Sequence, residues 1–257
     1  QEAPDWVKDN FVALIAEALE GGSLFFPRST RHSAAKPGVG PTVVGFSDYG
    51  QFAYEARVYL RWALVEGEAD EFSARLAFCK ARVLQFRGMT VPRGELTGLT
   101  LQSRLMLRVV TALQKLDIPP VRSVMCCDST CAISATHSTR SLLPYFQNGV
   151  AEIKDNMDQI RKFCPLDDVQ YVETSLNPSD ISTKATATLD SLGPESFHQT
   201  GPRFLCLPRE QWPVTSDVPQ EDLPEDEYRL RDKLVFSAAM RINFCHSSVF
   251  PANPWGV

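Results

Sequence analysis

The sequence predicts an α/β fold, a five-stranded mixed sheet flanked by helices, and three observations support it. Three β-rich segments with short connections come first, which is the pattern of an antiparallel meander. Strand and helix patterns then alternate after Pro92, which favours parallel strands joined by helices. The chain has 257 residues, 44% hydrophobic and 22% charged, an ordinary composition for a globular protein.

The segment before the sheet has its own character. Residues 5–19 place apolar side chains at helical spacing, and Gly21 and Gly22 end that pattern. A polar linker rich in Gly and Pro follows. We expect residues 1–40 to form a helix and a linker outside the main domain.

The main domain, expected over residues 41–192, begins with the meander. Its strands are predicted from TVVGFSD, which ends at Asp48, and from FAYEARVYLRW and SARLAFCKARVLQF, which are rich in aromatic and β-branched residues. Helical periodicity then extends from Pro92 to about Leu116. A proline suits the first turn of a helix, because its missing N–H would have no partner there.

The second half of this domain alternates between strands and helices. VRSVMCCDS is a compact apolar strand that ends at Asp128, and helical patterns follow at about 129–136 and 144–163. VQYVET predicts the fifth strand. NPSDISTKA then reads as the start of a helix, with Asn177 or Ser179 as its cap.

Residues 193–257 lose this alternation. PVTSDVPQEDLPEDEYRLRD is proline-rich and acidic, so we expect a C-terminal extension that ends in a solvated linker. No apolar run approaches the roughly 18 residues that span a bilayer, so no membrane partner is expected. The seven cysteines have no zinc-site spacing, and Cys126 and Cys127 are expected to be core residues in a reducing compartment.

Four acidic residues occupy related positions in this order of elements. Asp48 and Asp128 end strands, Glu95 lies in the first turn of the long helix, and Asp180 opens the last helix. Helix electrostatics alone would explain Glu95. Together, however, the four can converge at one sheet edge, where like charges repel unless a cation neutralises them. Two Mg²⁺ or Mn²⁺ ions about 4 Å apart would suit such oxygen ligands and phosphodiester hydrolysis.

These acids lie within blocks that carry a family resemblance. VGFSDYGQFAYEARVYLRW resembles FSDAS..AYGAVVYLR, and CKARVLQFRGMTVPRGELTGL resembles AKSRV…IPRLEL. CCDSTCAI resembles WTDS.IVL, FQNGVAEI resembles FVANRVAEI, and NPSDISTK resembles NPADLASRG. GPESFHQTGPRFLCLPREQWP resembles a W..GP.FL….WP element. The chain is thus similar to the RNase H region of BEL/Pao-type retrotransposon polyproteins.

The resemblance implies an RNase H-like fold and an RNA–DNA hybrid ribonuclease, an endonuclease active in reverse transcription. It implies two bound divalent cations and, in one polyprotein, reverse transcriptase and integrase domains as partners. The helix at 5–19 would then belong to a connection with the polymerase. The expected location is a cytoplasmic virus-like particle or the nucleus. The implied metal-binding and catalytic acids are Asp48, Glu95, Asp128 and Asp180.

Some positions depart from the family blocks. Glu55 stands where the family has glycine, Gly94 where it has leucine, and Gly149 where it has arginine. Many RNases H have a histidine shortly before the last aspartate, and here only Glu173 is present. These departures bear on rate and substrate binding, because none removes a metal ligand.

Four further residues are candidates for nucleic-acid binding. Ser129 and Thr130 either contact phosphates at a helix N-terminus or simply cap that helix. Lys184 either meets a phosphate or is a solvated helix lysine. Arg93 either holds a nucleic-acid strand or pairs with a nearby acid.

Two other functions remain open. A decayed or domesticated copy would bind nucleic acid or protein without cutting it. An integrase or transposase core would use a similar sheet, but with three acids of which a late glutamate is the last. The order Asp, Glu, Asp, Asp favours the RNase H arrangement.

Overall fold

The computed structural model describes residues 29–51, 53–67, 71–84, 89–180, 193–217, 223–224 and 227–228, and isolated positions before residue 29. Most of the predicted helix at 5–19 lies outside these residues. So do Lys184 and all but the first residue of the helix predicted after Asn177. Within the described part, no helix is long and apolar enough to cross a membrane.

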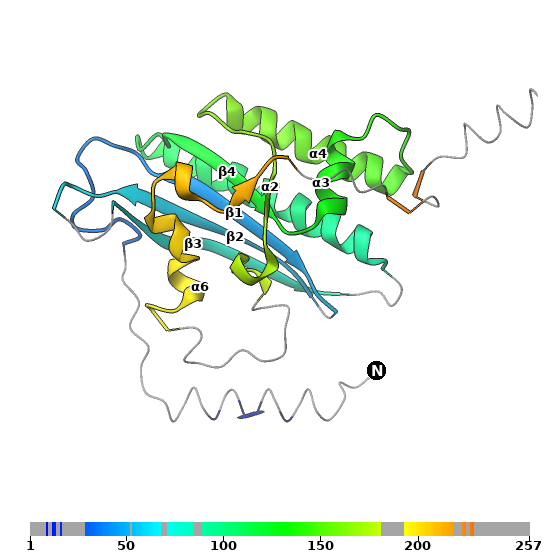
Figure 1. Ribbon diagram of the computed structural model, residues 1–257, viewed down its shortest axis with the longest axis horizontal. Coiled ribbons are helices and arrows are strands. Elements are labelled where there is room, and N and C mark those ends of the chain that lie inside the picture. Colours follow the sequence, from blue (N-terminus) through cyan, green and yellow to red (C-terminus); the bar gives the residue numbers. More distant parts are fainter. Residues whose placement is uncertain are drawn as a thin grey trace, which may run out of the picture.

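The described strands form one mixed sheet with the order β3-β2-β1-β4-β5-β6 (Figure 1). The first three strands are antiparallel, β4 and β5 run parallel to β1, and β6 closes the edge antiparallel to β5. The predicted mixed sheet is confirmed, and β6 is an addition from the C-terminal extension. The strands are β1 (Thr42–Tyr49), β2 (Ala53–Ala63), β3 (Phe72–Val83), β4 (Arg122–Cys127), β5 (Gln170–Val172) and β6 (Val214–Thr215).

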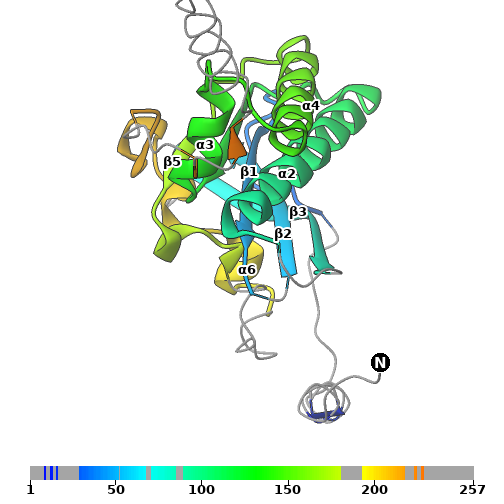
Figure 2. The same ribbon diagram turned by 90° about the vertical axis from the view of Figure 1, so that its right-hand side faces the viewer.

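Three helices cover one face of the sheet (Figure 2). They are α2 (Val91–Lys115), α3 (Thr130–His137) and α4 (Pro144–Arg161). The long helix α2 lies on β1 and β2 and packs against α4, because most of its leucines, among them Leu99 and Leu105, are buried along one side. The predicted helix from Pro92 is confirmed, and Pro92 occupies the first turn.

The first turn of α2 lies close to the end of β1. A Cβ atom added to Gly94 would lie 2.2 Å from ring atoms of Tyr49. The ring therefore occupies the space that a side chain at position 94 would need. Gly94, where the family block has leucine, allows this contact.

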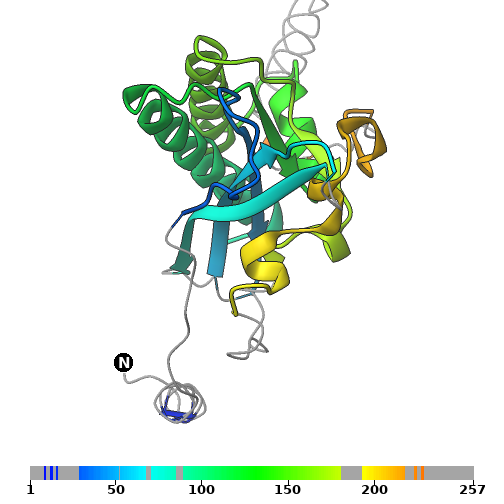
Figure 3. The same ribbon diagram turned by 90° about the vertical axis from the view of Figure 1, so that its left-hand side faces the viewer.

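The opposite face of the sheet is covered by the C-terminal extension (Figure 3). Its short elements are α6 (Phe197–Thr200), η3 (Arg203–Cys206) and η4 (Arg209–Gln211). Phe204, Leu205 and Trp212 pack here against Phe46 and Tyr59 of the central strands. The fold therefore extends beyond residue 192, where the sequence suggested that the main domain ends.

Side chains of β2 fasten this extension through its backbone. The Arg61 guanidinium donates hydrogen bonds to the carbonyl oxygens of Leu205 and Leu207, both at 2.7 Å. The Tyr59 hydroxyl donates to the His198 carbonyl oxygen at 2.8 Å. Short helical turns without apolar periodicity are thus held by specific polar contacts.

Part of the acidic C-terminal segment also returns to the helical layer. Leu223, Glu227 and Tyr228 are buried, and the Leu143 amide donates to the Glu227 carbonyl oxygen at 2.9 Å. The Arg140 guanidinium lies 3.4 Å from the centre of the Tyr228 ring. For these residues the predicted solvated linker is wrong, because two apolar side chains and one paired acid are packed against the helices.

Candidate metal centre

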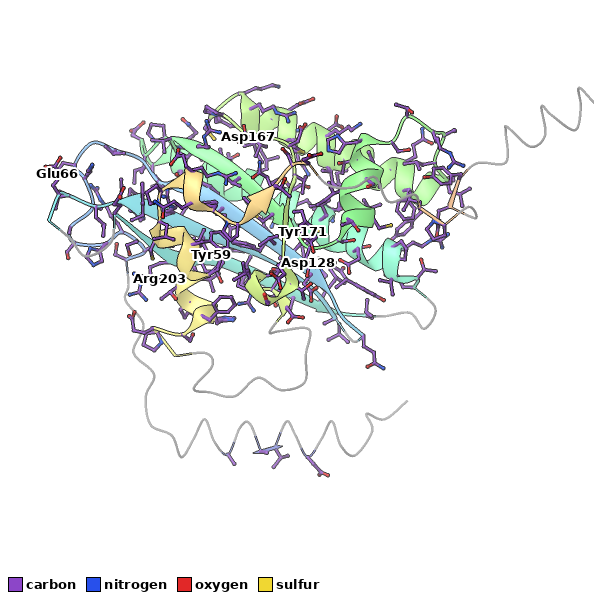
Figure 4. All side chains as sticks on the ribbon, in the orientation of Figure 1. Tyr59, Glu66, Asp128, Asp167, Tyr171 and Arg203 are labelled. Atoms are coloured by element: carbon purple, nitrogen blue, oxygen red, sulfur yellow. The ribbon has the colours of Figure 1, made fainter. Side chains whose placement is uncertain are left out.

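Two of the predicted acids lie side by side at the ends of adjacent parallel strands. Asp48 follows Ser47 in β1, and Asp128 follows Cys127, the last residue of β4. Ser47 and Cys127 are partners in the register between these strands. Parallel strands that are in register bring their next residues to the same edge. Figure 4 shows Asp128 at this end of the central strands.

The third acid reaches the same place from α2. Glu95 is the fifth residue of α2, just after the first turn, which holds no acid, so the predicted place in that first turn is wrong by one residue. A Cβ atom added to Gly98, one turn further along α2, would lie 3.1 Å from the Asp48 carbonyl oxygen. The small residue thus allows the helix to approach the strand closely, and Glu95 comes to lie over the strand ends.

The carboxyl groups of these three acids influence one another's protonation. Burial raises the pKa of Glu95 to about 8, and the charges of Asp128 and Asp48 add to this rise. Burial and the charge of Asp48 raise the pKa of Asp128 to about 6, although side-chain hydrogen bonds from Thr174 and Asn177 oppose the increase. The three acids are therefore crowded together, and the charges of Asp48 and Asp128 make ionisation of Glu95 less favourable.

The donor atoms fit a hard divalent cation. Carboxylate oxygens of Glu95 and Asp128 and the Cys127 sulfur all lie within 4.8 Å of one another. Among the described residues, the Asp128 Oδ1 atom is buried without a hydrogen-bond partner, so a cation would supply the contact that it lacks. Burial raises the pKa of the Cys127 thiol well above its ordinary value, so it stays neutral. Oxygen donors alone favour Mg²⁺ or Mn²⁺.

The fourth acid, Asp180, lies in a turn that is anchored to this edge. The Asp180 amide donates to the Asn177 carbonyl oxygen at 3.2 Å. The Asn177 side chain in turn donates to the Ser47 carbonyl oxygen at 2.8 Å, one residue before Asp48. The structure thus places three acids in one electrostatic environment and fastens the turn of the fourth to the same strand end.

For the other predicted residues, some alternatives can be decided. Ser129 caps α3, since its hydroxyl accepts a hydrogen bond from the Ala132 amide at 3.2 Å, and Thr130 begins that helix. Arg93 pairs with an acid: its guanidinium donates to both carboxylate oxygens of Glu227, at 2.8 and 3.0 Å. Capping and ion pairing are thus observed for Ser129 and Arg93.

The glutamate that replaces glycine in the family block does not add its charge to the acids. Glu55 is the cross-strand partner of Asp48 and is fully buried. Its carboxylate pairs with the buried Arg57 guanidinium, and the Cys79 thiol donates to it at 2.9 Å. The departure at position 55 is therefore compensated locally by a charge of opposite sign.

The sequence reasoning missed the partners of Asp128. Thr174 and Asn177 both form side-chain hydrogen bonds with it. Asn177 was expected only as a helix cap. The signal that could have indicated more is its position, three residues before a candidate metal ligand in the segment NPSD.

Residues 7–129 match the family described as the Pao retrotransposon-like RNaseH-like domain, and this range contains Asp48, Glu95 and Asp128. The chain is also similar to the N-terminal RNase H domain of a Mycobacterium tuberculosis protein, solved as a fusion with maltose binding protein. That likeness has 14% identity and a TM-score of 0.36, and covers 53% of this chain and 86% of the other. RNase H1 from Halobacterium salinarum NRC-1 is similar at 10% identity and a TM-score of 0.32, over 54% and 89% of the two chains. No curated protein matches the chain.

Proposed function

We propose that the chain is a hybrid-specific ribonuclease, because residues 7–129 match the Pao retrotransposon-like RNaseH-like domain family. It hydrolyses the RNA strand of RNA–DNA hybrids with Mg²⁺ or Mn²⁺, and it works beside reverse transcriptase and integrase domains of the same polyprotein. The observation that carries this proposal is the convergence of Asp48, Glu95 and Asp128, from three elements, around a buried oxygen that lacks a partner.

In this mechanism the acids of the chain would hold the divalent cations. Two divalent cations, when bound, activate a water and stabilise the leaving oxygen of the phosphodiester. Asp48, Glu95, Asp128 and Asp180 are the residues that would hold them. Thr174 and Asn177 keep the Asp128 carboxylate oriented through their hydrogen bonds.

Protonation of Glu95 links cation binding to pH. With its pKa raised to about 8, the Glu95 carboxyl carries a proton at neutral pH before a cation binds. Because a metal ligand must be deprotonated, Glu95 would have to lose this proton to hold a cation. Hydrolysis leaves a 3′-hydroxyl and a 5′-phosphate on the RNA strand.

The experiment that tests the proposal compares Asp128→Asn with a matched control, Asp167→Asn. Asp167 precedes β5 and is exposed, and it pairs at 2.7 Å with Arg122 at the opposite end of β4 (Figure 4). A labelled RNA–DNA hybrid, double-stranded RNA and double-stranded DNA are each incubated with Mg²⁺ and the purified chain.

We expect the unsubstituted chain and Asp167→Asn to cut the RNA strand of the hybrid alone. Asp128→Asn should lose at least about 100-fold in rate, since even a residue that only supports a metal ligand is typically worth 10–100-fold. Equal activity of all three chains would exclude the ribonuclease. Hybrid binding without any cleavage would instead favour the non-cleaving module.

A further inference from the structure

We infer that Gln102 is a positioning residue that sets the spacing of the metal-binding carboxylates. The inference rests on the proposed function and deepens it. The side-chain hydrogen bonds of Gln102 go to Ser47 and Cys126, which are neighbours of the acids. It acts through Ser47 and through the backbone of β4.

The side-chain amide of Gln102 joins the three elements that carry the converging acids. Gln102 is fully buried on α2, seven residues after Glu95. Its Oε1 atom accepts a hydrogen bond from the Ser47 hydroxyl at 2.8 Å, and its Nε2 group donates to the Cys126 carbonyl oxygen at 3.2 Å. Ser47 is the residue before Asp48 in the chain. A single amide therefore bridges α2, β1 and β4 beside the site.

The backbone of β1 leaves room for this amide. A Cβ atom added to Gly45 would lie 2.9 Å from Gln102 Nε2 and 2.4 Å from the Met106 sulfur. Glycine in the middle of a strand weakens it and often marks a close approach by another group. Here two side chains of α2 approach the strand, Met106 most closely and the Gln102 amide next, so the glycine makes room for both.

Hydrogen bonds can fix this geometry in a way that the surrounding packing cannot. The core between α2 and the sheet is largely apolar, and apolar attraction has no preferred direction. A leucine at position 102 would fill similar space but would let the helix shift along the strands. The two hydrogen bonds require defined distances and angles, so they hold Glu95 at one height above the strand ends.

Ser47 is fastened from a second side as well. Its carbonyl oxygen accepts a hydrogen bond from the Asn177 side chain at 2.8 Å, and the Asn177 carbonyl oxygen accepts one from the Asp180 amide. Ser47 is nearly completely buried. The elements that carry all four proposed ligands thus meet at Ser47, and Gln102 is the connection to α2.

The adjacent residue provides a matched control. Ser103 accepts a hydrogen bond from the Asn156 side chain at 3.0 Å, and both residues are buried. This pair joins α2 to α4, and its side-chain hydrogen bonds among the described residues stay within these two helices. Its loss removes a buried hydrogen bond between an amide side chain and the same helix. The connections of α2 to the strands that carry the acids stay intact.

The experiment measures cation binding directly, without substrate. Mn²⁺ is titrated by calorimetry into the full chain and into Gln102→Leu, Ser47→Ala, the double variant and the control Asn156→Leu. Folding of each chain is checked by circular dichroism, and Ser47→Ala serves as the mild variant if Gln102→Leu unfolds. Cleavage of a labelled hybrid against Mg²⁺ concentration is recorded as a second measurement.

We expect Gln102→Leu and Ser47→Ala to weaken Mn²⁺ binding by about 10–100-fold and to raise the Mg²⁺ requirement for cleavage similarly. The double variant should bind Mn²⁺ no more weakly than Gln102→Leu does, because both single substitutions remove the same hydrogen bond between Ser47 and Gln102. Asn156→Leu should stay within about twofold of the unsubstituted chain.

Two failures are distinguishable. If the unsubstituted chain neither binds Mn²⁺ nor cuts the hybrid, the proposed function itself fails. If that chain binds and cuts, but folded Gln102→Leu and Ser47→Ala keep their affinity, only the role of Gln102 is overturned. Equal weakening by Asn156→Leu would overturn it too, since the effect would then be one of general stability.

Discussion

Replacing Glu95 by glutamine should stabilise the cation-free chain at alkaline pH while removing the function of the site. The Glu95 pKa rises from 4.5 to about 8 on folding, first because of burial and then because of Asp128 and Asp48. The folded chain therefore binds this proton more tightly than the unfolded chain does. Stability that is present at pH 4.5 and below is lost as the pH rises toward 8.

The size of this loss follows from the pKa difference. Each pKa unit corresponds to about 1.4 kcal/mol, so the change between pH 5 and pH 8 has an upper value of about 4 kcal/mol. Glutamine resembles the protonated acid and cannot ionise, so Glu95→Gln avoids this loss. With about 2–4 °C per kcal/mol for a chain of this size, its melting temperature at pH 8 should exceed that of the unsubstituted chain by at most about 8–16 °C.

Thermal unfolding followed by circular dichroism in EDTA, at pH 5, 6.5 and 8, measures this difference. The melting temperatures of the two chains should coincide at pH 5 and separate progressively toward pH 8. Added Mg²⁺ should raise the melting temperature of the unsubstituted chain alone. Glu152→Gln is the control with the opposite sign, because its hydrogen bonds with Arg104 lower the pKa of Glu152. If Glu95→Gln melted at or below the temperature of the unsubstituted chain at pH 8 in EDTA, the reasoning about the buried acids would be refuted.

Three other predictions concern the parts of the fold that support the site. A chain that ends at Leu192 loses Phe204, Leu205 and Trp212, each of which contributes about 2–5 kcal/mol to the free energy of unfolding, so it should aggregate. Size-exclusion chromatography measures this, and a monodisperse fragment that melts cooperatively would contradict it. Glu227→Ala should lower the free energy of unfolding, measured in urea, by about 1–3 kcal/mol, because Glu227 is buried and its partner Arg93 is partly exposed. An unchanged urea midpoint would show that this ion pair is not formed. Gly94→Leu should cost about 2 kcal/mol or more through collision with the Tyr49 ring, and adding Tyr49→Ala should restore most of that loss; additive losses in the double variant would argue against the contact.

The sequence predicted the central part of the fold because its signals are local. Asp48 and Asp128 end buried, β-rich runs, and Glu95 follows a proline that begins a long amphipathic helix. Such patterns fix the direction of each element and hence the edge at which its last residue lies. Convergence of three acids followed from the order of the elements alone.

The remaining contacts have no local signature. Arg93 and Glu227 are separated by 134 positions, and only the folded chain brings them together. The extension over the second face lacks periodicity, because its short helical turns are fastened by Arg61 and Tyr59 rather than by an amphipathic stripe. Gln102 had a weak signal, since a polar residue two turns after Glu95 interrupts the apolar side of α2.

The residues that cover the second face of the sheet lie late in the chain, so the ribosome makes them after the strands that they cover. The ribosome adds about 5–20 residues per second, so the 100 residues from Asp128 to Tyr228 take roughly 5–20 s. During that interval the nascent chain already contains Phe46 and Tyr59, but not all of the residues that later shield them. Chaperones that recognise apolar surface have this period in which to bind. Asp48, Glu95 and Asp128 are thus made well before the segment that covers the second face of the sheet.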